Sequence, residues 1–144
     1  MNLKALIKKW HAATNVLEFM GGAIFNGPVT SIGGGSAGPL VTVTYSAAPV
    51  IDASLGNVFV MTISNGNAIV VAAPTNPIGI GQIIWFTVRN ASGGAHGALT
   101  WNAIFKTQAT AFSAVANGFS RTVVFRWDGT NWVEMVRTAA DVAN

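Results

Sequence analysis

Residues 82–90 read Gln-Ile-Ile-Trp-Phe-Thr-Val-Arg-Asn, and this stretch decides the fold class. It is rich in β-branched and aromatic residues and contains no glycine or proline, which is typical of a β-strand. Side chains alternate between the two faces of a strand, so Ile84 and Phe86 share one face while Trp85 and Arg89 share the other. Because both faces carry large apolar groups, we expect one face to line the core and the other to meet another subunit or sheet.

Similar apolar runs fill the chain from residue 40 onward, separated by glycine, proline and asparagine. About eight short strands without intervening helical repeats predict an all-β fold, an antiparallel β-sandwich or jelly roll over residues 40–144. The predicted strands are Leu40–Tyr45, Val50–Ile51, Asn57–Ser64, Ala68–Ala72, Gln82–Asn90, Ala98–Trp101, Ser120–Trp127 and Trp132–Arg137.

Two dipeptides predict tight hairpin turns. Asn65-Gly66 and Asp128-Gly129 each supply residues that tolerate positive φ between two apolar runs. If the second turn has a four-residue loop, Trp127 and Trp132 face each other across the last two strands.

Residues 1–39 form a separate N-terminal region, an arm followed by a glycine-rich linker. The linker, residues 21–39, has too many glycines for a helix or a central strand. An apolar stripe left in water loses roughly 1.5–3 kcal/mol for each large side chain, so we expect the arm to dock on another surface. The arm is predicted to be extended or partly helical from the spacing of Leu3, Leu6, Ile7, Trp10, Leu17 and Phe19.

The composition points to an oligomer. Charged residues make up 9% of the 144-residue chain and hydrophobic residues 51%, against about 25% charged residues in ordinary soluble domains. No stretch approaches the roughly 18–20 consecutive apolar residues of a spanning helix, so we expect no membrane span. The net charge of +3 comes without a dense basic patch, so we expect no nucleic-acid partner. Extra apolar surface is then expected to lie in subunit contacts.

No residue pattern indicates catalysis. The chain has no cysteine, and residues 33–38 match a dinucleotide fingerprint without the strand and helix that phosphate binding needs. Asp52 and Asp128 are explained by loop and turn positions, and Glu134 is expected to pair across strands with Arg126. We therefore expect a protein that is not an enzyme and uses no metal or cofactor.

Two residues are candidate ligand-binding groups. His96 lies in a glycine-rich loop that looks exposed. No carboxylate, cysteine or second histidine lies near it in the sequence, so we expect His96 to have no chemical role. Trp101, together with Trp127 and Trp132, could form a platform on which sugars stack, although packing in the core or between subunits is favoured.

Several turn motifs carry a resemblance to a known group of proteins. They are Asp52–Asn57, Ala73–Pro77 with Gly81-Gln82, Leu99–Trp101 with Phe105-Lys106, and Trp127–Trp132. Over about residues 45–136 the chain resembles a module of bacteriophage virion proteins, found as the C-terminal domain of tail fibres and as small capsid-decorating (cement) proteins. The resemblance implies a trimeric β-sandwich in the virion, assembled in the bacterial cytoplasm.

Two functions follow from this resemblance. Only an arm and a linker precede the module, whereas tail fibres usually carry a long shaft, so we expect a decoration protein that binds the major capsid protein or another virion protein. The alternative is a tail-fibre tip that recognises a host glycan through Trp101 and His96. The residues expected at capsid or subunit contacts are Leu3, Leu6, Ile7, Trp10, Leu17, Phe19, Trp85 and Arg89.

Overall fold

A computed structural model describes residues 7–11, 16–19, 39–108 and 112–144 of the chain. The chain divides into two compact units, Met1–Ser36 and Ala37–Asn144, which are treated separately below. The described residues contain one short 3-10 turn, Ala53–Leu55, whose N-cap Asp52 accepts the Ser54 N–H. No helix among them is long and apolar enough to cross a membrane.

The first unit contains a pair of strands where part of a helix was expected. Strand β1 (Ile7–His11) runs antiparallel to β2 (Val16–Phe19), with Ile7 opposite Phe19 and Trp10 opposite Leu17. Of the two forms predicted for the arm, extended or partly helical, these residues therefore take the extended one. The register shifts between Ile7 and Lys9. Leu3 and Leu6 lie outside the described residues.

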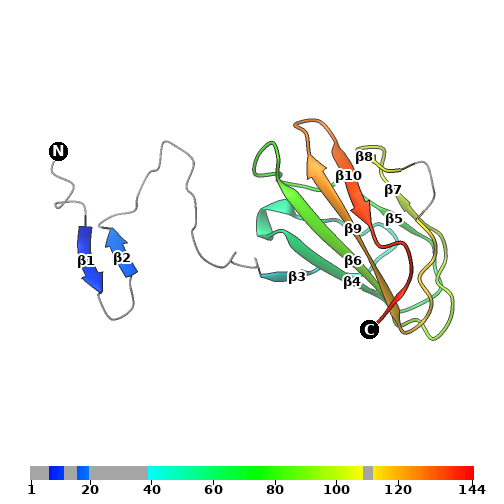
Figure 1. The fold of residues 1–144 in the computed structure, drawn as a ribbon. Helices are drawn as coiled ribbons and strands as arrows, with labels where there is room; N and C mark the ends of the chain where they lie inside the picture. Colours follow the sequence, from blue (N-terminus) through cyan, green and yellow to red (C-terminus); the bar gives the residue numbers. More distant parts are fainter. Residues whose placement is uncertain (1–6, 12–15, 20–38, 109–111) are drawn as a thin grey trace. The chain divides into compact units, whose positions relative to one another are not determined.

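The second unit contains a seven-stranded sheet and a separate two-stranded sheet (Figure 1). The order along the larger sheet is β3-β4-β6-β9-β10-β8, and β11 pairs with β9. Its strands are β3 (Leu40–Thr42), β4 (Val58–Ile63), β6 (Ile83–Asn90), β8 (Phe105–Lys106), β9 (Phe119–Trp127), β10 (Trp132–Arg137) and β11 (Val142–Ala143). The smaller sheet pairs β5 (Ile69–Val71) with β7 (Leu99–Trp101).

The larger sheet is mixed, so the prediction of an antiparallel fold is wrong. Strand β4 runs parallel to both β3 and β6, β8 runs parallel to β10, and β5 runs parallel to β7. The physical reason is the path of the chain. After β4 the chain forms β5 in the other sheet and then returns to form β6 parallel to β4, the kind of crossover connection that parallel neighbours need.

The two predicted hairpins have different outcomes. The Asp128-Gly129 turn joins the antiparallel strands β9 and β10 with Trp127 opposite Trp132, as predicted. The indole rings of these two residues lie 5.3 Å apart between centroids. Asn65-Gly66 also forms a local turn, in which the Asn65 side chain accepts the Asn67 N–H. This turn leads from β4 into β5 in the other sheet, so the hairpin predicted there is wrong.

Most predicted strands are present, with ends that differ by a few residues. Val50–Ile51 is an exception, since no strand forms there and the Ile51 carbonyl accepts the Thr75 N–H instead. The short strands β8 and β11 were not predicted, because two residues are too few to show alternation.

Strands of both sheets contribute side chains to one buried core. The inner face of the larger sheet supplies the core residues of β4, β6 and β9, and β5 and β7 add theirs to the same cluster. Along β6, buried residues alternate with exposed or partly exposed ones, as the sequence predicted. The largest fully buried side chains are Trp132, Phe59, Phe86 and Phe125.

Candidate interface on the outer face of the sheet

The outer face is the side of the seven-stranded sheet that points away from the core. Trp85, at the centre of β6, is 49% exposed there, and Ile83 and Arg89 are exposed on the same side. Strand register places Val124 and Val58 beside Trp85. Apolar side chains therefore run across several strands, and we define the outer face by Leu40, Val58, Val60, Ile83, Trp85, Arg89, Thr122, Val124, Arg126 and Val136.

A hollow lies on this face beside Trp85. It has a volume of about 180 Å³ and is walled by Trp85, Thr122, Val124, Val136, Arg137 and Thr138. Three of these residues are aromatic or aliphatic, and the threonines add methyl groups, so the hollow suits an apolar side chain. Val136 is half exposed at its rim.

An ion pair lies on the core side of β10, where Arg137 is opposite the core residue Val123. Arg137 donates two hydrogen bonds to the Glu134 carboxylate, and its guanidinium lies 5.8 Å from the centre of the Phe112 ring. Burial alone would raise the pKa of Glu134, but hydrogen bonds from Arg137 and from the Gln108 N–H hold it below its usual value. The hydrogen bonds to Glu134 raise the pKa of Arg137. Glu134 was expected to pair with Arg126; that prediction is wrong, because Arg126 lies opposite Val133 on the outer face.

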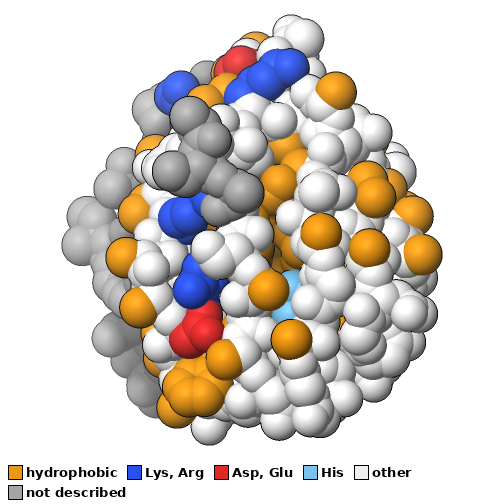
Figure 2. Space-filling view, turned by 90° about the vertical axis from the view of Figure 1, so that its right-hand side faces the viewer, with side chains coloured by type: hydrophobic (Ala, Val, Ile, Leu, Met, Phe, Trp, Pro, Cys, Tyr) orange, Lys and Arg blue, Asp and Glu red, His pale blue; other side chains and the backbone are white. Residues whose placement is uncertain are grey.

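The charges of the outer face are cationic. Arg89 makes no ion pair or side-chain hydrogen bond within the described part of the chain, and Arg126 lies at the other end of the β6–β9 pair, opposite Ile83. Two acidic residues form ion pairs within the subunit, Asp141 with Arg121 and Glu134 with Arg137. Figure 2 shows one side of the molecule, on which most side chains are uncharged.

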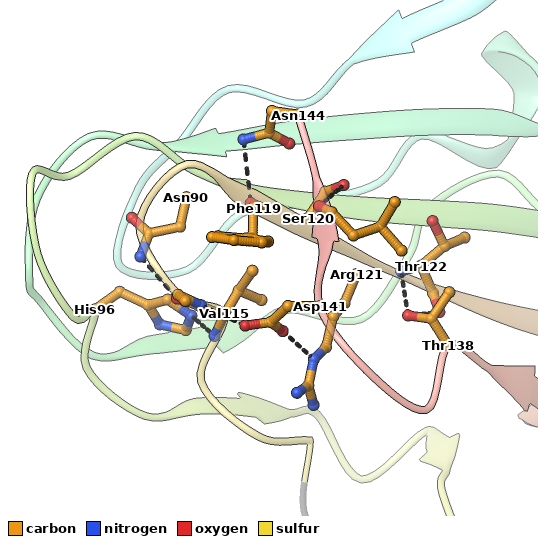
Figure 3. Close-up of polar contacts among 12 residues, drawn as sticks. Asn90, His96, Val115, Phe119, Ser120, Arg121, Thr122, Thr138, Asp141 and Asn144 are labelled. Atoms are coloured by element: carbon orange, nitrogen blue, oxygen red, sulfur yellow. Dashed lines mark hydrogen bonds and ion pairs between the residues drawn. The ribbon is translucent and has the colours of Figure 1, made fainter.

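His96 belongs to a buried polar cluster at the far end of β6 (Figure 3). Its side chain is only 5% exposed, so the prediction of an exposed loop histidine is wrong. Nε2 accepts the Val115 N–H at 2.7 Å, and Nδ1 lies 2.6 Å from the Gly97 carbonyl. A ring that accepts at Nε2 donates from Nδ1, so this is the neutral tautomer, and both nitrogens are already used. This arrangement gives His96 a structural role.

Trp101 is packed by aromatic rings and is only partly accessible. Four phenylalanine rings contact it edge-on, with centroids 5.1–6.0 Å away: Phe86, Phe105, Phe112 and Phe125. A sugar-stacking platform needs an open ring face. With His96 buried as well, this geometry gives no support to glycan binding by these two residues.

One exposed apolar feature was missed in the sequence, the loop that precedes β6. Ile78 is 70% exposed and Ile80 is 81% exposed. The signal was the run Ile78-Gly79-Ile80-Gly81, in which two large aliphatic residues stand in a glycine-rich turn where polar residues are usual.

Comparison with known proteins does not assign a family. No protein-family model matches the chain, and no curated protein matches it. Within the described residues, no group of three or more His, Cys, Asp or Glu side chains is arranged to hold a metal ion.

Proposed function

We propose that this chain is a structural subunit of a bacteriophage particle, a decoration protein that binds the assembled head as a trimer. The observation that carries the proposal is the outer face, where Leu40, Ile83 and Trp85 are 61%, 37% and 49% exposed on a hydrogen-bonded sheet. Leaving such side chains exposed costs roughly 1.5–3 kcal/mol each. A surface of this kind is typical of a subunit that is completed by other protein surfaces.

We also infer that the second unit is a β-sandwich. In support, the β5–β7 pair and the inner face of the larger sheet bury their side chains in one cluster, the arrangement of two facing sheets. In such a fold the inner faces are saturated, so only the outer faces and the loops are free to contact partners.

The proposed mechanism is stabilisation by mass action. A protein that binds only the intact capsid lattice stabilises it, by about 2.7 kcal/mol per site when its free concentration is 100 times its Kd. Three arms in one trimer would bind the lattice with avidity if the geometry lets them engage together. In this proposal the outer face holds subunits together and residues 1–39 reach the capsid.

The test uses heads that lack the protein. We expect the full chain to bind such heads in a saturable, stoichiometric way and to raise the temperature at which they release DNA. A variant without residues 2–27 should remain a folded oligomer and lose head binding. Normal occupancy by the shortened chain would contradict the role of the arm, and absence of the full chain from heads would contradict the proposed function.

A further inference from the structure

The loop before β6 holds two isoleucines in a fixed position in water. The Gln82 side chain ties this loop down: Oε1 accepts the Ile78 N–H at 3.0 Å, and Nε2 donates to the Ala53 carbonyl at 2.7 Å. The Gly81 N–H donates to the Trp127 carbonyl at 2.8 Å, which ties the loop to the end of β9. The loop is therefore pre-organised, so less conformational entropy is lost when its apolar tips are buried against a partner.

Two carboxylates lie near this loop, and Arg126, which is opposite Ile83, lies at the same end of the sheet. Ile80 lies against the β9–β10 turn, near Gly129, and Asp128 directly precedes Gly129 in the chain. Asp52 precedes the Ala53–Leu55 turn to which Gln82 is bonded. Hydrogen bonds to both carboxylates lower their pKa values, so both are ionised at neutral pH. Neither makes an ion pair within the described residues.

We propose that the Ile78–Gly81 loop of one copy inserts into the hollow beside Trp85 on the outer face of a second copy. The proposal rests on the oligomer named in the proposed function and specifies its contact. The partner is a second copy because one chain carries both halves, a pre-organised aliphatic tip and an apolar hollow of about 180 Å³ that the described residues leave open. Charge complementarity supports the same partner, since the loop end brings Asp52 and Asp128 toward a face that carries Arg89.

This contact joins two different surfaces of the same chain, so it is heterologous. A heterologous contact closes into a ring such as a trimer or continues as an open chain, whereas a face-to-face contact stops at a dimer. Pairing outer face with outer face is also disfavoured by charge, because it would bring cationic surfaces together without carboxylates on either side.

The experiment separates the two halves of the contact. The loop variant carries Ile78→Ser and Ile80→Ser, and the hollow variant carries Val136→Glu. Val70, half exposed on β5, supplies matched controls as Val70→Ser and Val70→Glu. Sedimentation velocity measures the mass of each across a range of concentrations, and the urea midpoint of each confirms that it is folded.

We expect the loop and hollow variants to associate at least about tenfold more weakly than the native chain, while both Val70 variants associate as the native chain does. An equimolar mixture of the loop and hollow variants should form dimers and nothing larger. In that mixture, one intact loop meets one intact hollow, and no further site remains.

Two results would overturn the inference: native association by the loop variant, or a mixture that stays as single subunits. The outcome is also distinct from failure of the proposed function. A native chain that forms loop-dependent oligomers but does not bind heads contradicts the decoration role alone, whereas a native chain that stays a single subunit contradicts this contact and the trimer.

Discussion

Replacement of Asn90 by alanine is expected to destabilise the protein strongly, although this side chain is buried on the side of β6 away from the outer face. Asn90 ends β6 and is fully buried. Its amide nitrogen donates to the carbonyls of Gly94 at 2.9 Å and Val115 at 2.7 Å, and its oxygen accepts the Ser92 N–H at 2.9 Å. One side chain thus joins two loops to the end of the central strand (Figure 3).

The size of the expected loss of stability follows from the groups that lose a hydrogen-bond partner when Asn90 is removed. The Val115 carbonyl is buried, and an unpaired buried polar group costs about 1–3 kcal/mol. The other two bonds are partly accessible, so water can replace Asn90 there, at a cost of about 0.5–1.5 kcal/mol each. The expected loss is therefore about 2–6 kcal/mol, less whatever water or loop movement recovers, out of a total near 5–15 kcal/mol for a domain.

Urea unfolding followed by tryptophan fluorescence measures this loss, at one fixed protein concentration because an oligomer's stability depends on concentration. Asn90→Asp is the informative companion, because a carboxylate can accept the Ser92 N–H but cannot donate to the two carbonyls. It should therefore be at least as unstable as the alanine variant at neutral pH and should partly recover when acid protonates it. A loss below about 1 kcal/mol in Asn90→Ala would refute the reasoning that this residue holds the two loops.

Three further outcomes can be checked in the same unfolding assay. Gly97→Ala should lose about 1–3 kcal/mol, because an added Cβ would lie 2.6 Å from the Ala68 backbone nitrogen, while Gly94→Ala, with open space around it, should change stability by less than about 0.5 kcal/mol. Gly129→Ala should lose about 1–2 kcal/mol, because φ is +103° there and the Cβ would press on Ile80. The Asp141 carboxylate accepts hydrogen bonds from the Ala116 N–H and from Arg121, and these bonds lower its pKa. The ionised carboxylate therefore stabilises the folded protein at neutral pH, and this contribution is lost as the pH falls below about 4. Asp141→Asn should lack this loss of stability in acid.

Local features of the fold were predictable because they depend on neighbouring residues. Alternation in residues 82–90 located β6 and assigned Trp85 to the outer side, and the Asp128-Gly129 turn set the Trp127–Trp132 register. At Asn65-Gly66 the chain does turn, but neither residue has positive φ and no hairpin forms. A turn fixes only the direction in which the chain reverses, however, and the next strand can join either sheet. The parallel pairs could therefore not be deduced from the sequence.

The candidate site was predictable only in part, for the same physical reason. Trp85 and Arg89 were found from their strand face, whereas the hollow depends on β9 and β10, far along the chain. His96 looked exposed because glycines surround it, but its burial is made possible by the Val115 N–H, 19 residues away. A buried imidazole needs partners for both nitrogens, and no local pattern shows that a distant backbone group will supply one.

The distribution of charge argues that the exposed apolar face is a contact surface. Glu134 and Asp141 are each bound to an arginine of the same subunit, so these pairs do little to attract a partner. Arg89 remains on the outer face, and the carboxylates Asp52 and Asp128 remain at the loop end, where Arg126 also lies. A sheet face solvated on its own would be expected to carry polar residues at its centre, where this chain has Trp85 and its valine neighbours. If the loop end of one subunit covers the outer face of the next, the apolar tips of the loop are buried and its carboxylates come close to Arg89.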